Sequence, residues 1–144
     1  MKQQKEHANM KYICLSYLGP INWKTMSESE RKASMDEFFA YDEMLRKNGN
    51  IVGGEGLQSA QNATTLRFQH GKVSVTDGPY AETKEQLAGF FILEARDLNH
   101  AIQLMSKHPV VRGGPIEIRP AADHSEMNRE RERRRATTKS KLET

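Results

Sequence analysis

The sequence predicts a small α+β domain in which two β-α-β units share one sheet. Apolar residues alternate along several short runs, as they do in half-buried strands, and two longer stretches space them three or four apart, as in amphipathic helices. These segments follow one another in the order strand, helix, strands, helix, strand along 144 residues. A chain of this length fits one domain with tails.

The first unit begins with a strand and a long helix. Residues 10–17 carry apolar side chains on both alternating faces, which predicts a central strand, and Gly19-Pro20 ends it. Ser27 is followed three residues later by a glutamate, a capping box that starts a helix. The helix runs to about Asn48, where Gly49 provides a left-handed stop. Its predicted buried stripe is Met35, Phe38, Tyr41 and Leu45.

A hairpin is predicted between the two units. Residues 51–57 start as a strand and continue into a glycine-rich stretch around Glu55. Residues 64–68 and 72–76 alternate and flank a tight turn, as in a β-hairpin. Asp77-Gly-Pro then forms a turn, because glycine and proline fix the backbone there.

The second unit repeats the first in shorter form. Residues 89–95 predict an apolar strand, Asp97 caps a helix that ends at His108-Pro109, and residues 115–119 predict a final strand. The predicted buried residues of this helix are Leu98, Ala101, Ile102 and Met105. A duplicated β-α-β with an inserted hairpin is the ferredoxin-like arrangement.

This architecture predicts a homodimer. Two helices cover one face of the sheet, and aliphatic and aromatic residues on several strands indicate that the other face is also apolar. A second copy of the chain is the simplest cover, giving a dimeric α+β barrel.

Composition excludes several classes. The single cysteine, Cys14, forms no intramolecular disulfide or cysteine cluster for zinc, and it is predicted to be a small buried hydrophobe. No metal set is visible, and the stretch around Glu55 is no dinucleotide fingerprint because no helix opens after it. No cofactor is therefore expected. Without a signal peptide or an 18-residue apolar run, the predicted location is cytoplasmic.

The positive charge lies at the C-terminal end. The chain carries a net charge of +3, and residues 129–141 hold seven basic and two acidic side chains. We therefore expect a flexible extension over residues 1–9, a folded domain over 10–122, and a charged, disordered tail over 123–144. Contact with nucleic acid is expected only through that tail, and the alternative is a solubilising segment.

Residues 77–90, with the sequence DGPYAETKEQLAGF, closely resemble the DGPF branch of the YCII-related family, which usually has phenylalanine where Tyr80 stands. Supporting matches extend the resemblance over residues 10–121: they lie at 10–12, 54–57, 63–65 and 114–120. The resemblance implies a ferredoxin-like fold and a dimeric α+β barrel, and defines no activity.

In more distant members of the wider family, a histidine and an aspartate are suspected of acid–base chemistry. The predicted first helix contains no histidine, so no such pair is predicted here. His108 is instead interpreted as a cation stabilised at the C-terminal end of a helix dipole.

Candidate site residues come from the signature and its neighbours. Asp77 and Glu55 are the acid–base candidates. The candidate substrate-binding residues are Tyr80, Glu82, Lys84, Glu117 and Arg119. Each has a structural alternative: Asp77 caps its turn, Glu55 belongs to a β-bulge, Glu82 and Lys84 lie in a solvated loop, and Glu117 and Arg119 form ion pairs across strands or across the dimer.

Two functions follow as hypotheses. In the first, the protein binds a small polar or anionic organic molecule and performs cofactor-independent acid–base chemistry on it. In the second, it is a non-catalytic regulatory or interaction module associated with sigma-factor-linked transcription control, which the resemblance implies because such members are often encoded beside alternative sigma factors.

Overall fold

The computed structural model describes residues 9–19 and 25–143. The predicted N-terminal extension, apart from residue 9, and the proline predicted to end the first strand lie outside the described residues. The elements, in chain order, are β1 (Met10–Leu18), α1 (Glu28–Lys47), β2 (Ile51–Gly56), η3 (Ala60–Asn62), β3 (Thr64–Gln69), β4 (Lys72–Asp77), β5 (Gln86–Ala95), α2 (Leu98–Ser106), η4 (Pro109–Arg112), β6 (Ile116–Pro120) and α3 (Ser125–Glu143).

The main sheet has the ferredoxin-like strand order. Its four strands run β2-β5-β1-β6, and each neighbouring pair is antiparallel. Ile13 lies opposite Ile92 on one side of β1, and Cys14 lies opposite Ile118 on the other. The predicted fold class is therefore confirmed, with the two β-α-β units interleaved in a single sheet.

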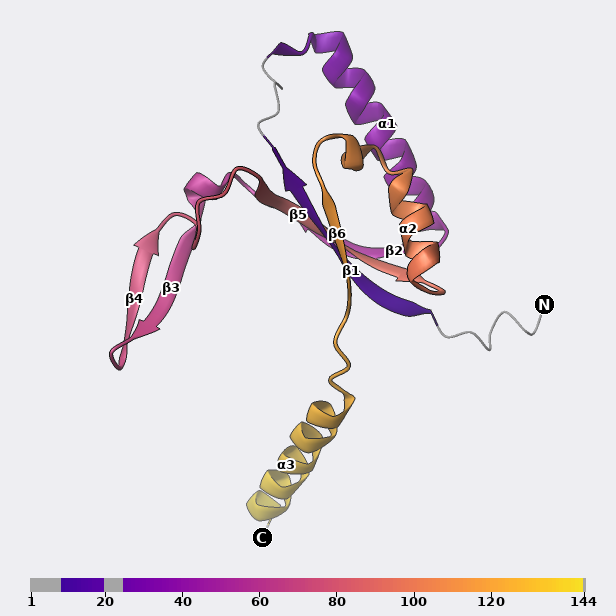
Figure 1. Cartoon of the computed structure of the whole chain (residues 1–144). Helices are drawn as coiled ribbons and strands as arrows, with labels where there is room; N and C mark the ends of the chain where they lie inside the picture. The colour runs from indigo at the N-terminus through magenta and orange to yellow at the C-terminus, as the bar shows by residue number, and fades with distance from the viewer. Residues whose placement is uncertain (1–8, 20–24, 144) are drawn as a thin grey trace, which may run out of the picture.

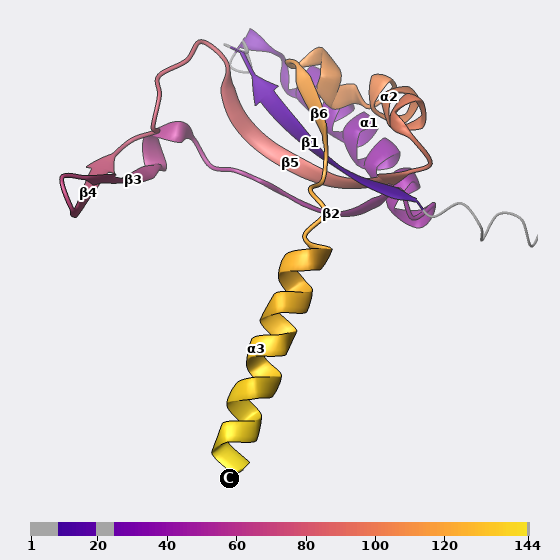
Figure 2. The same ribbon diagram turned by 60° about the horizontal axis from the view of Figure 1, so that its bottom comes forward.

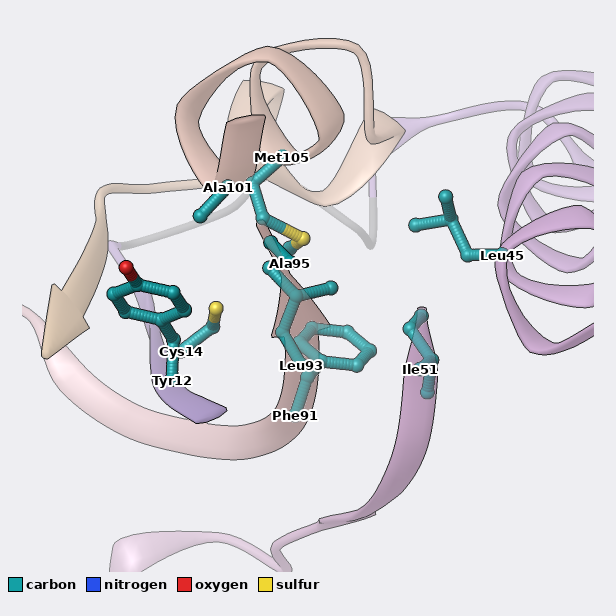
Figure 3. Packing of buried hydrophobic residues seen from close by; sticks show 9 residues of the cluster. All are labelled: Tyr12, Cys14, Leu45, Ile51, Phe91, Leu93, Ala95, Ala101 and Met105. Carbon is teal, nitrogen blue, oxygen red and sulfur yellow. The ribbon is translucent and has the colours of Figure 1, made fainter. Parts of the chain in front are cut away.

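Both α1 and α2 cover the same face of this sheet, and the opposite face is bare (Figures 1 and 2). The core lies between that sheet face and the helices, because alternate residues of β1 and β5 point towards them. Figure 3 shows the buried hydrophobic cluster, which consists of Tyr12, Cys14, Leu45, Ile51, Phe91, Leu93, Ala95, Ala101 and Met105. Cys14 is fully buried as predicted, and burial raises the pKa of its thiol to about 11.

The predicted helix caps are present. The backbone N–H of Glu30 donates to Ser27 Oγ at 3.1 Å, and Gly49 takes the left-handed conformation after α1, with φ of 77°. At α2, the N–H of His100 donates to Asp97 Oδ1 at 2.8 Å. Each cap satisfies an N–H group that the first turn of a helix leaves without an intrahelical partner.

Three residues predicted to be buried are not. Leu98 and Ile102 are 47% and 44% exposed, because the short helix α2 reaches the core through Ala101 and Met105. Met35 is 44% exposed and lines an apolar groove near the start of α1. The predicted stripe holds for the second half of α1 only.

The predicted hairpin forms and projects away from the main sheet (Figures 1 and 2). In its register, Leu66 lies opposite Val75 and Phe68 lies opposite Val73, so these side chains share one face. Each of the four is more than 60% exposed. The hairpin thus carries an apolar face that the described part of the chain does not cover.

The C-terminal segment forms helix α3, where a disordered tail was expected. Its side chains are solvated, as expected, with Glu130 alone partly buried among them. Glu130 pairs with Arg133 and Arg134 within the helix. Residues with high helix propensity and such short-range ion pairs favour helix even without tertiary packing. Among the described residues, no helix is long and apolar enough to cross a membrane.

Candidate functional site

A cavity of about 420 Å³ lies between α1 and the sheet. It exists because the helix-facing positions at this end of the sheet carry very small side chains. Gly56 lies opposite Gly89 across β2 and β5, and Ser16 lies opposite Gly89 on the other side. Where the core places Phe91 and Leu93, these positions leave open space under the helix.

Gly54 and Gly56 have different structural roles. Gly54 follows a register shift in β2, has φ of 145°, and any Cβ there would lie 2.4 Å from the carbonyl oxygen of Phe90. A Cβ at Gly56 would meet nothing within 4 Å. Gly54 is therefore required by the bulged strand, as the structural alternative for this stretch predicted, whereas Gly56 contributes empty volume.

The walls of the cavity are mainly apolar, with a few polar groups. The apolar side chains come from β1, α1, β5 and η4: Leu18, Phe38, Phe39, Phe91 and Val110. The polar ones are Ser16, Asp42, Arg46 and Glu55. Apolar walls with a few convergent polar groups are typical of small-molecule sites.

Asp42 and His108 form a buried pair beside this cavity. His108 Nε2 lies 3.6 Å from Asp42 Oδ1, slightly beyond hydrogen-bond distance, and both atoms are buried without a hydrogen-bond partner. His108 is fully buried, while the Asp42 side chain is 14% exposed and lines the cavity. A ligand in the cavity would therefore meet Asp42, with His108 behind it.

Aromatic rings and one backbone bond explain the burial of His108. Its ring centroid lies 4.9 Å from that of Phe38, 5.3 Å from Tyr41 and 5.1 Å from Phe91. Its Nδ1 accepts a hydrogen bond from the N–H of Val110 at 3.1 Å, which caps η4. Because Nδ1 is an acceptor, the proton of the neutral ring is assigned to Nε2, facing Asp42.

The prediction that His108 is a stabilised cation is wrong. Burial lowers the pKa of His108, and this outweighs the nearby carboxylate of Asp42, which acts in the opposite direction. The three aromatic rings replace the water that would stabilise an imidazolium, so the ring is neutral near pH 7. The structure places a histidine beside an aspartate although α1 contains no histidine, since His108 lies after α2, at the N-cap of η4.

Arg46 holds the other carboxylate oxygen. Its Nε donates to Asp42 Oδ2 at 2.7 Å, one helical turn along α1, and the Arg46 side chain is 47% exposed. Asp42 is thus positioned from both sides: Oδ1 is buried against His108, and Oδ2 meets Arg46 at the cavity wall.

The predicted site residues do not gather in one place. Glu55 is exposed at the cavity end of β2, and it lies opposite Phe90, so its side chain shares the bare face of the sheet. Asp77 is exposed at the end of β4, in the projecting hairpin, and Tyr80 is 78% exposed just after it. Glu82 and Lys84 lie in the exposed segment before β5.

Glu117 and Arg119 are exposed on β6 and form an ion pair with each other. They share the face of the sheet that the helices leave bare, so they lie on the opposite side from the cavity. Their pairing is along the strand, and not across strands as one alternative expected.

Sequence reasoning missed Asp42, Arg46 and His108. Asp42 lies four residues after Phe38 and three before Leu45, so an acidic side chain interrupts the apolar stripe of α1. A carboxylate in a buried stripe is rare unless it is paired. That interruption was the available signal for Asp42, whereas His108 carried no comparable signal.

Comparison with known proteins agrees with this fold. Residues 10–125 match the YCII-related domain family. The chain belongs to the YCII-related family. This YCII-related protein is 32% identical over 117 residues to an uncharacterised protein of Rhizobium meliloti (strain 1021). The aligned region covers 78% of this chain and 93% of the Rhizobium protein. Helix α3 lies almost wholly beyond the family domain.

Proposed function

We propose that this YCII-related protein binds a small polar or anionic organic molecule in the cavity under α1 and exchanges a proton with it through Asp42. The observation that carries the proposal is the buried Asp42–His108 pair at the wall of the cavity, with two polar atoms left without hydrogen-bond partners. Such atoms are costly to bury, and they occur in native proteins where function requires them.

In this proposal Asp42 is the catalytic residue and His108 is a positioning residue. Asp42 is the member of the pair that reaches the cavity, so it would accept or return the proton of the ligand. His108 is shielded from the ligand, and its Nε2–H faces the inner carboxylate oxygen and orients it. The less exposed walls Phe38 and Phe91 would limit access of water to the buried side of Asp42.

The first test is a native mass spectrum of the gently purified full-length protein. The proposal predicts extra small-molecule mass on the wild type and its loss in Gly56→Leu, because the new side chain enters open space in the cavity. Retention of the same mass by Gly56→Leu would place the molecule elsewhere.

The second test concerns the proton. The compound identified by mass is incubated with the protein in D₂O, and deuterium incorporation into it is followed by NMR. We expect incorporation with the wild type and with Asp36→Asn, an exposed residue of the same helix, and at least a 100-fold slower rate with Asp42→Asn. Equal rates in all three proteins would refute the role of Asp42.

We also propose that the chain forms a homodimer through the bare face of its sheet. Ile13, Leu15, Tyr17, Phe90 and Ile92 lie on that face and are half-buried in the single chain. The apolar face of the hairpin is a second uncovered surface of the same chain. An isologous pair would bury the sheet faces against each other, whereas the cavity lies on the opposite, helix-covered face.

A further inference from the structure

The guanidinium of Arg46 has unused donors at the cavity wall. Its Nε donates to Asp42, and the structure gives its two terminal nitrogens no partner within residues 9–19 and 25–143. A guanidinium carries five N–H donors in a planar fork, and the two terminal nitrogens match the two oxygens of a carboxylate. Arg46 lines the cavity, so this free part of the fork is accessible to a ligand there.

The carboxylate of Asp42 is less available to a ligand than these donors. Its Oδ1 is buried beside His108, 3.6 Å from Nε2, and its Oδ2 accepts from Arg46. Glu55 is exposed and lies opposite Phe90, on the bare face of the sheet. The terminal N–H groups of Arg46 are therefore the polar groups that a ligand in the inner cavity engages most directly, and the ligand must supply the acceptors.

The balance of charge limits the ligand to a single negative charge. Arg46 is the one basic side chain among the described residues that line the cavity, and it already holds the acidic Asp42. One guanidinium that holds a carboxylate can accept a second monoanion, but a dianion would leave a further negative charge uncompensated beside Asp42. A monocarboxylate fits this limit better than a phosphate or a dicarboxylate.

The rest of the ligand must be apolar and small. Three phenylalanines and two aliphatic residues form most of the wall, and 420 Å³ is near the lower end of the range for ligand pockets. A flat or chair-shaped ring fills such a space and contacts the aromatic walls on both sides.

From these points we infer that the cavity takes an aryl or alicyclic monocarboxylate, whose carboxylate binds the terminal nitrogens of Arg46 and whose ring lies against Phe38, Phe39 and Phe91. This inference rests on the proposed function, and it names the substrate class of that same site. Arg46 bridges the two carboxylates, so it holds the ligand next to the cavity-facing oxygen of Asp42.

The test compares three probes of one shape and different charge: phenylacetate, phenylacetamide and 2-phenylethylamine, with a matching cyclohexyl series. Affinity is measured by isothermal titration calorimetry on the full-length protein near neutral pH. A charged hydrogen-bond pair predicts that one of the carboxylates binds at least about tenfold more tightly than its amide. The amine should bind more weakly than either.

Variants separate the carboxylate contact from the cavity itself. Arg46→Met keeps the length of the stem and removes the donors, so it should abolish the preference for the carboxylate over the amide. Lys47→Gln, an exposed neighbour on the same helix, should leave it unchanged. Gly56→Leu should abolish binding of every probe, and circular dichroism checks that each variant folds.

Three outcomes would contradict the inference, and they differ in whether they also contradict the proposed function. Equal binding of carboxylate and amide, with both lost in Gly56→Leu, means that the cavity binds small molecules of another class, so the proposed function stands. Tighter binding of the amine means that an acidic group selects the ligand. Binding that is unchanged in Gly56→Leu, or no binding by either series, would contradict the inferred ligand class and would also count against a binding site in this cavity.

Discussion

At the residue scale, the proton exchange that we propose for Asp42 depends on the proton that His108 carries on Nε2. The ring packs among Phe38, Tyr41 and Phe91, and its other nitrogen accepts from the backbone of Val110. The carboxylate of Asp42 lies beside it, with Oδ1 3.6 Å from Nε2. A neutral imidazole can therefore act as a donor to Asp42 without adding a charge to the core.

This burial predicts that stability falls with acid. The pKa of His108 is lowered from 6.5 in the folded state, so below about pH 6.5 the unfolded chain binds a proton that the folded chain excludes. The unfolding free energy should therefore decrease as the pH falls from about 6.5 towards the lower pKa of the folded state. Above about pH 6.5 this contribution is absent, because the histidine is neutral in both states.

Urea unfolding at about pH 7.5 and about pH 5.5 measures the effect. In His108→Gln the decrease between these two pH values should be smaller than in the wild type. The control is His70→Asn, an exposed position in the hairpin turn where φ of 53° suits asparagine. An identical decrease in all three proteins would mean that His108 is not the group responsible.

The state of His108 could not be predicted from its neighbours in sequence. A histidine before proline at the end of a helix usually faces solvent, where the helix dipole favours the cation. Three rings from two distant elements bury it here instead, and their convergence depends on tertiary packing. Cys14, which lies in a central strand, was predictable because alternation alone determines the face of the sheet it occupies.

At the scale of elements, β2 combines a structural glycine with one that leaves space. Gly54→Ala should destabilise the fold by about 2 kcal/mol or more, because the new Cβ would meet the carbonyl oxygen of Phe90 at 2.4 Å and the residue would keep φ of 145°. Gly56→Ala should change stability by less than about 1 kcal/mol, since nothing lies within 4 Å. Equal effects in denaturant titrations would show that the bulge is not as described.

Helix α1 attaches to the sheet through the second half of its length. Leu45→Ala should cost about 2–5 kcal/mol, because this fully buried side chain belongs to the hydrophobic cluster that also contains Ile51 and Leu93. Met44→Ala, one residue earlier and 43% exposed, should cost less than about 1 kcal/mol. Thermal unfolding of the two variants measures this difference in stability. Similar losses of stability would mean that α1 turns a different face towards the sheet.

Elements were easier to predict than the cavity between them. The caps at Ser27 and Asp97 and the left-handed Gly49 depend on local backbone chemistry, and they lie where the sequence predicted. The cavity depends on which strands become neighbours, since Gly56, Gly89 and Ser16 come from three strands. No local pattern shows that those three small residues meet under one helix.

At the scale of the whole molecule, the bare sheet face predicts a dimer that a charge should disrupt. Leu15 lies on that face between Phe90 and Glu117. Leu15→Glu should convert the dimer to monomer in light-scattering chromatography while preserving the circular dichroism spectrum, because an unpaired carboxylate would be buried at the interface. Val111→Glu, exposed on the helix side, serves as the control. A monomeric wild type would contradict the proposed homodimer.

Amide chemical shifts measure directly where a small molecule binds to this protein. The ¹⁵N-labelled full-length protein is titrated with a library of small organic compounds. A molecule bound under α1 should shift the amides of Gly54, Gly56 and Gly89 and of the surrounding residues of the cavity most strongly. Shifts that concentrate instead on the hairpin and the segment around Asp77 and Tyr80 would contradict it, and would return the site to the residues that the sequence first suggested.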